Sequence, residues 1–107
     1  MSHISPFYPI DEVRAAAAAG RLIAESGADT HSRELGYSRE AVLKVLKNLD
    51  IKQFHKTYLY PQRNFPLDSY KLKALSDTKQ FDDLYIKFAL RGEGKSRILL
   101  VSFHLNR

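Results

Sequence analysis

Histidine, lysine and tyrosine side chains recur in the second half of the chain, and these groups carry out proton transfer and phosphate binding. The segment "QFHKTYLY", residues 53–60, places His55 beside Lys56 among three aromatic rings. Imidazole exchanges protons near neutral pH, and an ammonium group attracts anions as a compact point charge. The segment is therefore either a strand that happens to carry charge or part of a site that handles a charged substrate.

Several other kinds of catalytic site lack their motifs in this sequence. The chain contains no cysteine, which excludes a thiolate metal site. It contains neither a phosphate-binding glycine loop nor the turn motif of hydrolase serines. The histidines, none of which has metal-ligand spacing, are His3, His31, His55 and His104. We therefore expect no bound metal and no small-molecule cofactor.

The charge of the chain favours an anionic partner. Its 107 residues include 17 Lys and Arg against 12 Asp and Glu, which gives a net charge of +5. Such a charge is typical of proteins that bind nucleic acids, acidic proteins or anionic membranes. We find no secretory signal and no stretch long enough to span a bilayer. We therefore expect a cytoplasmic protein without a membrane partner, and the lack of cysteine fits that reducing compartment.

The pattern of apolar residues changes near residue 50 and predicts an α+β fold. Residues 9–50 are mainly helical in their spacing, whereas residues 51–107 alternate with the period of strands. We predict a single domain, residues 1–107, in which N-terminal helices pack on a mostly antiparallel, twisted β-sheet. Residues 1–8 precede the first helical pattern and are predicted to be flexible.

Capping residues locate the predicted helices. A first helix begins near Ile10 and ends before Gly20, a residue type that commonly terminates helices. Ser38 can cap another helix, which runs to about Asn48. Residues 25–36, which lie between these helices, are polar and predict at most one short helical turn.

One helical turn and four strands complete the predicted fold. Asp50 can cap the turn, with Gln53 as its reciprocal partner. The predicted strands are "TYLY" at 57–60, "DSYKLKAL" at 68–75, "LYIKFAL" at 84–90 and "RILLVSFHL" at 97–105. The glycines of "RGEGKS" predict a hairpin turn between the last two. His55 and Lys56 then lie at the junction between the helical turn and the first strand.

Alternation along the strands predicts which side chains share a face of the sheet. The core residues predicted for the last strand are Leu99, Val101 and Phe103. The residues predicted on the opposite, open face are Tyr85, Lys87, His104, Lys71 and Lys73. We expect no Asp or Glu among them. Such a face is either a solvated sheet surface, where lysine discourages edge pairing, or a platform for a phosphate backbone with aromatic rings for stacking bases.

The order of four segments resembles the MqsR family of toxins. These segments are "LGYSREAVLKVLKNLDIKQFHKTYLY", "LDSY", "LYIKFAL" and "ILLVSFHLNR", and the resemblance extends from about Asp11 to Arg107. It implies a RelE-like fold and the toxin of a bacterial toxin–antitoxin pair. It further implies a cytoplasmic endoribonuclease that cleaves mRNA without a metal ion and is held inactive by a cognate antitoxin.

The resemblance also suggests catalytic residues. The family's lysine falls on Lys56, its strand tyrosine on Tyr85, and the basic residue near its end on His104, where lysine is usual. His55 replaces a usual tyrosine, and Leu67 stands near the family's glutamine, whose hydrogen bonds leucine cannot make. We expect Lys56 to act as a cation on the phosphate, Tyr85 to orient that phosphate, and His104 to transfer protons.

Five residues are predicted to contact RNA, and two alternative functions remain open. The predicted RNA-binding residues are His55, Arg63, Lys71, Lys73 and Lys87. One alternative is a non-catalytic module that binds RNA or ribosomes through the same basic face. The other is a protein-interaction domain whose lysine face meets only an acidic partner.

Overall fold

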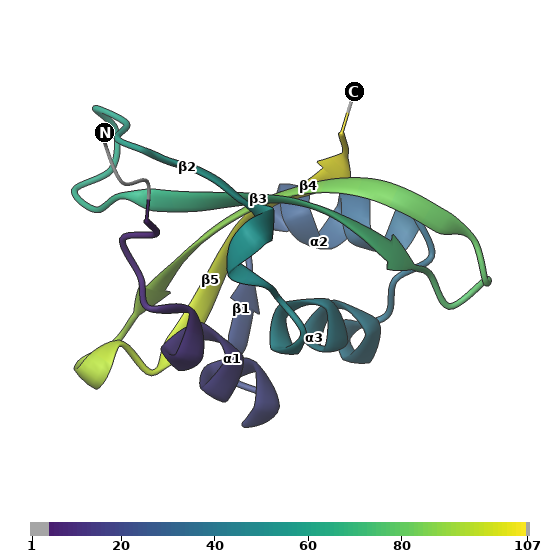
Figure 1. Cartoon of the computed structure of the whole chain (residues 1–107), viewed down its shortest axis with the longest axis horizontal. Coiled ribbons are helices and arrows are strands. Elements are labelled where there is room, and N and C mark those ends of the chain that lie inside the picture. The colour runs from purple at the N-terminus through teal and green to yellow at the C-terminus, as the bar shows by residue number, and fades with distance from the viewer. Residues whose placement is uncertain (1–4, 107) are drawn as a thin grey trace.

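A five-stranded sheet, in the order β1-β5-β4-β3-β2, carries the α-helices on one of its faces (Figure 1). The computed structural model describes residues 5–106. The helices are α1 (Ile10–Ala18), α2 (Ser26–Glu34) and α3 (Arg39–Lys47). The strands are β1 (Leu22–Ala24), β2 (Phe54–Tyr58), β3 (Leu67–Leu75), β4 (Phe81–Arg91) and β5 (Arg97–Leu105). The predicted α+β fold is confirmed, and the arrangement is compatible with a RelE-like fold.

The predicted capping residues define two of the helical segments. The Ser38 side chain accepts a hydrogen bond from the Ala41 N–H at the start of α3. Asp50 and Gln53 form a reciprocal capping box around the short 3-10 helix Ile51–Gln53. Both predictions are confirmed, and the second cap determines where the chain passes from α3 to β2.

The first half of the chain differs from the prediction at α2 and β1. Residues 25–36 were expected to form one short turn, but α2 is a nine-residue helix that packs on β5 through Ala28. Its apolar stripe is too narrow to be recognised from the sequence alone. The alternation of apolar residues did not reveal β1, which has three residues. β1 pairs in parallel with β5, and Leu22 lies opposite Ile98. The remaining strand pairs are antiparallel.

A β-bulge in β5 shifts the predicted core positions of that strand. Lys87 pairs with Ser102, but the next residue of β4 pairs with Leu100, so Val101 is an extra residue without a partner across the ladder. Ile98 and Leu100 are therefore fully buried, whereas Leu99 and Val101, which were predicted in the core, are only partly buried. Beyond the bulge the predicted alternation is correct, with Phe103 buried and His104 exposed.

A second bulge lies in β2, which begins at Phe54 instead of near Thr57. Phe54 pairs with Tyr70 and Lys56 pairs with Ser69, so His55 is the extra residue. The buried Ser69 hydroxyl accepts a hydrogen bond from the Lys56 N–H, at 3.2 Å, and donates one to the Lys56 carbonyl, at 2.7 Å. His55 and Lys56 thus belong to a strand that is anchored to its neighbour, and not to the junction that was predicted.

Tyr70 packs in the core between Phe54 and Phe88, and its hydroxyl is buried without a hydrogen-bond partner among residues 5–106. We expect Tyr70→Phe to raise the free energy of unfolding by about 1 kcal/mol, because phenylalanine keeps the ring and removes an unsatisfied polar group. Urea denaturation measures this change. A clear loss of stability in the variant would contradict it.

Candidate active site

The sheet face opposite the helices carries a row of polar side chains from three adjacent strands. Tyr85 on β4 lies opposite Lys71 on β3 and opposite His104 on β5. Side chains of directly opposed residues point to the same face of a sheet. We call this surface the open face. The predicted alternation therefore placed these three residues correctly with respect to one another.

The ring of Tyr85 lies at the centre of this row. It stacks on the His104 ring, with centroids 5.3 Å apart and planes 13° from parallel. The His55 ring meets it edge-on, with centroids 6.0 Å apart. The Lys71 ammonium lies 6.0 Å from the Tyr85 ring centroid. Two imidazoles and one ammonium group thus surround the ring of a single phenol.

The Tyr85 hydroxyl donates a hydrogen bond of 2.7 Å to the hydroxyl of Tyr58. Burial raises the pKa of Tyr85, and the hydrogen bond to Tyr58 raises this pKa further. Ser69 and Lys87 act on the same pKa in the opposite direction without reversing the shift. The phenol is therefore protonated at neutral pH, which makes it a hydrogen-bond donor to an anion and a poor base.

The ammonium group of Lys56 lies 4.6 Å from the centroid of the Tyr58 ring, at the edge of the open face. The Lys56 side chain is exposed, so a ligand can reach its charge directly. The bulge at His55 and the two hydrogen bonds between Ser69 and the Lys56 backbone hold the chain beneath it. Lys56 thus presents an exposed positive charge from an anchored backbone, beside Tyr58, which accepts the hydrogen bond of the Tyr85 hydroxyl.

Lys87 lies among tyrosine rings. Its ammonium is 5.1 Å from the ring centroids of both Tyr58 and Tyr60 and donates a 2.8 Å hydrogen bond to the Tyr60 hydroxyl. The rings of Tyr58 and Tyr60 stack on each other, with their centroids 5.7 Å apart. Sequence reasoning did not select these two tyrosines, although their spacing of two residues in "TYLY" was a sign that they share a face.

Two other predicted RNA-binding residues have acidic partners. Lys73 forms an exposed salt bridge of 3.9 Å with Asp83. Asp83 belongs to β4, which begins earlier than the predicted segment 84–90, so a carboxylate lies opposite Lys73 although the predicted strand segments contribute none to the open face. Arg63, in the loop that follows β2, forms two 2.8 Å hydrogen bonds with Glu25. Arg63 is therefore paired with a carboxylate outside the cluster around Tyr85. Leu67, which stands near the family's glutamine position, is buried.

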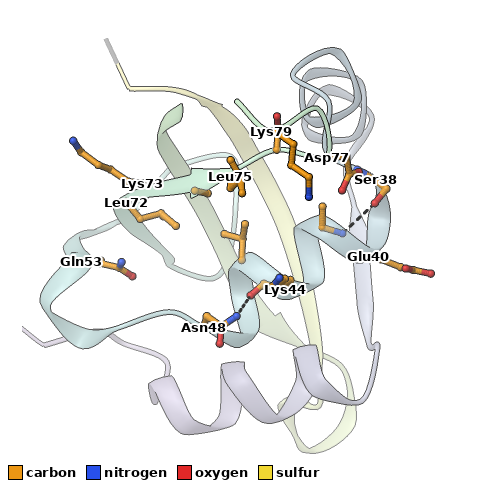
Figure 2. Close-up of a pocket in the computed structure, with 14 residues that line it drawn as sticks. Ser38, Glu40, Lys44, Asn48, Gln53, Leu72, Lys73, Leu75, Asp77 and Lys79 are labelled. Carbon is orange, nitrogen blue, oxygen red and sulfur yellow. Dashed lines mark hydrogen bonds between the residues drawn. The ribbon is translucent and has the colours of Figure 1, made fainter. Parts of the chain in front are cut away.

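A groove of about 400 Å³ lies on the other side of the sheet, between α3 and β3. Lys44, Asn48 and Leu72 contribute to its lining. Figure 2 shows that the Lys73 side chain extends away from α3. Lys73 nevertheless also contributes to the lining of this groove. Within the described part of the chain, no group of three or more His, Asp or Glu side chains is placed to hold a metal ion.

Comparison with known proteins identifies the family of this chain. The family model described as motility quorum-sensing regulator, toxin of MqsA, matches residues 5–105. The chain belongs to the MqsR toxin family. It is accordingly the toxin of a toxin–antitoxin pair, and the family implies an antitoxin partner.

A search of curated proteins finds no match. None of the helices among residues 5–106 is long and apolar enough to cross a membrane.

Proposed function

We propose that this toxin is a cytoplasmic, metal-independent endoribonuclease that cleaves mRNA and arrests growth until its cognate antitoxin neutralises it. The observation that supports this function most is the stack of Tyr85 on His104, with His55 at the edge of the same ring. Proton-transfer groups and a phosphate-orienting hydroxyl share one exposed surface there. Membership of the MqsR toxin family supports the biological role.

RNA supplies its own nucleophile, the 2′-hydroxyl, so the protein needs to move protons and stabilise charge. Lys56 holds a non-bridging oxygen of the scissile phosphate, and the Tyr85 hydroxyl exchanges its hydrogen bond to Tyr58 for one to the same phosphate. His104 takes part in proton transfer. Positioned charges and acid–base groups each contribute about 10²- to 10⁴-fold to reactions of this kind. The products are a 2′,3′-cyclic phosphate and a 5′-hydroxyl.

The remaining predicted residues line the path of the RNA strand. Lys71 neutralises backbone phosphate beside Tyr85, and Lys73 does so farther along β3, where its exposed pairing with Asp83 costs little to break. Lys87 holds the stacked tyrosines Tyr58 and Tyr60 in place, which gives flanking bases a surface for stacking. Arg63 is a weaker candidate for an RNA contact because its guanidinium already forms a 2.8 Å salt bridge with Glu25.

Incubation with an unstructured RNA in EDTA tests this function. We expect the wild type to cleave it, and we expect Tyr85→Phe and His104→Ala to cleave it at least about tenfold more slowly. Abolition of cleavage by EDTA would contradict the metal-independent mechanism. Unimpaired cleavage by these variants and by Lys56→Ala would contradict the site.

Leu67 favours the alternative of a non-catalytic RNA- or ribosome-binding module, because its buried side chain cannot make the hydrogen bonds of the family's glutamine. A module of this kind would bind RNA without cleaving it, and its affinity would fall steeply with salt concentration. Electrophoretic mobility shifts at several salt concentrations, with the RNA recovered and sized afterwards, distinguish the two functions. Intact RNA after prolonged incubation would favour the alternative.

A further inference from the structure

Two histidines far apart in the sequence contact the same tyrosine ring from different strands. β4, which carries Tyr85, lies between β5 on one side and β3 and β2 on the other (Figure 1). His104 reaches the ring from β5, with centroids 5.3 Å apart, and His55 reaches it from β2, with centroids 6.0 Å apart. The imidazoles therefore flank the Tyr85 side chain across the sheet.

The bulge in β2 is what brings His55 to this face. Consecutive residues of a regular strand point to opposite faces, so His55 and Lys56 would ordinarily lie on different sides of the sheet. Here Lys56 is opposite Ser69 and His55 is the inserted residue. Its ring contacts Tyr85 on the open face, where the Lys56 ammonium also lies. Bulges commonly redirect a side chain beside an active site.

Cleavage of RNA by its 2′-hydroxyl needs two proton transfers at separate positions. The attacking 2′-oxygen and the departing 5′-oxygen lie on opposite sides of the phosphorus in the transition state. A base near the first oxygen and an acid near the second must therefore approach the phosphate from different directions. Two imidazoles that contact the Tyr85 ring from different strands can approach a phosphate bound at this tyrosine from different directions.

We infer that His55 and His104 act as a base–acid pair across Tyr85, which adds His55 to the catalytic residues of the nuclease proposed above. His55 accepts the proton of the 2′-hydroxyl as the 2′-oxygen forms its bond to phosphorus. His104 donates a proton to the 5′-oxygen as the bond between phosphorus and that oxygen breaks. Exchange of protons with solvent then restores both imidazoles. This inference rests on the proposed nuclease function.

The surroundings of His55 suit a base. Burial lowers its pKa, and the charges of Lys71 on β3 and Lys56 on β2 lower it further. The neutral form, which can accept a proton, is therefore favoured at neutral pH. The Tyr85 phenol on β4 also faces this ring.

The surroundings of His104 suit an acid. Its Nδ1 lies 2.9 Å from the Leu105 carbonyl oxygen, which can only accept a hydrogen bond, so this nitrogen carries a proton. The second ring nitrogen remains for the substrate. Tyr85 faces the ring from β4, while His31 and Glu34 of α2 line the same shallow hollow as His104. The side chain is exposed, so it can exchange protons with solvent after each turnover.

A substrate with a better leaving group distinguishes the two roles. Once cleavage has been mapped on natural RNA, the bridging 5′-oxygen at that position is replaced by sulfur, which departs without protonation. We expect His104→Ala to be slowed about 10²-fold or more on the natural substrate and restored to near the wild-type rate on the sulfur substrate. We expect His55→Ala to be slowed to a similar extent on both substrates.

A ring-preserving variant and a pH profile complete the test. His55→Phe keeps a ring beside Tyr85 but cannot accept a proton, so we expect it to be as slow as His55→Ala. We also expect its cleavage rate to lack the fall at low pH that protonation of His55 causes in the wild type. Wild-type rates for His55→Phe, or rescue of His55→Ala by sulfur, would overturn the inference while leaving the nuclease function intact. No cleavage by the wild type would overturn both. Thermal unfolding verifies that each variant is folded.

Discussion

Replacement of Lys56 by alanine should lower kcat for RNA cleavage by about 10²- to 10³-fold, the usual cost of removing one group that stabilises transition-state charge. The Lys56 ammonium is exposed, and a bulged strand anchored by Ser69 carries it to the edge of the open face. Its charge acts most strongly when the phosphate gains negative charge, so KM should change much less than kcat. Single-turnover and steady-state rates in EDTA measure both quantities.

Two further variants make this result specific. Lys56→Arg retains the positive charge and should recover part of the lost rate. Lys52→Ala removes an exposed lysine four positions earlier, in the 3-10 helix before β2, and should leave the cleavage rate unchanged. Equal rates for Lys56→Ala and Lys52→Ala would show that Lys56 contributes only general positive charge, which contradicts its place in the site.

Replacement of Asp68 by alanine should lower the free energy of unfolding by about 3 kcal/mol, the largest loss of stability that we expect from a single polar residue. The buried carboxylate accepts hydrogen bonds from the backbone N–H groups of Phe7 and Tyr8, at 3.0 and 2.8 Å. It also accepts one from the Thr57 hydroxyl at 2.6 Å. Alanine would leave the buried Tyr8 N–H without this acceptor, which costs more than the bond itself contributes.

Asp83 provides the matched control for this prediction, because it is also an aspartate on the sheet but its exposed carboxylate forms a 3.9 Å salt bridge with Lys73. We expect Asp83→Ala to change stability by less than about 0.5 kcal/mol. Urea denaturation of both variants, followed by circular dichroism, gives the comparison. Similar free energies of unfolding for the two variants would contradict the role of Asp68 in anchoring the N-terminal segment to β2 and β3.

The anchoring by Asp68 also bears on a prediction about the N-terminus. Residues 1–8 were expected to be flexible; the structure describes only residues 5–8 of this range, and in these Tyr8 is buried. Its hydroxyl also donates a 2.8 Å hydrogen bond to the Pro66 carbonyl. Nothing in the local sequence indicates these bonds, because both partners are about 60 residues away along the chain.

Local signals in the sequence were sufficient for most elements of the fold. Ser38 and Asp50 are capping residues whose partners lie within three positions, and both caps were predicted correctly. β1 was missed because three residues are too few to show alternation, and its parallel pairing with β5 is a long-range contact. α2 was underestimated because packing against the sheet, and not its own apolar pattern, stabilises it.

The site was predictable only where the strands are regular. The alternation correctly aligned Tyr85 with His104 because no bulge interrupts that part of the ladder. The bulges at His55 and Val101 have no sequence signature, and each changes which face the neighbouring side chains occupy. The position of Lys56 came from the family resemblance, whereas its placement on the open face beside His55 required the structure.

The chemistry at the cleaved phosphate tests the central claim most directly. We propose incubating the wild type in EDTA with an RNA oligonucleotide, and with the same oligonucleotide carrying a single 2′-deoxy substitution at the mapped position, and identifying the product ends by mass spectrometry. The site predicts a 2′,3′-cyclic phosphate and a 5′-hydroxyl from the RNA, and no cleavage at the 2′-deoxy position. Products with a 3′-hydroxyl and a 5′-phosphate, or cleavage at the 2′-deoxy position, would contradict it.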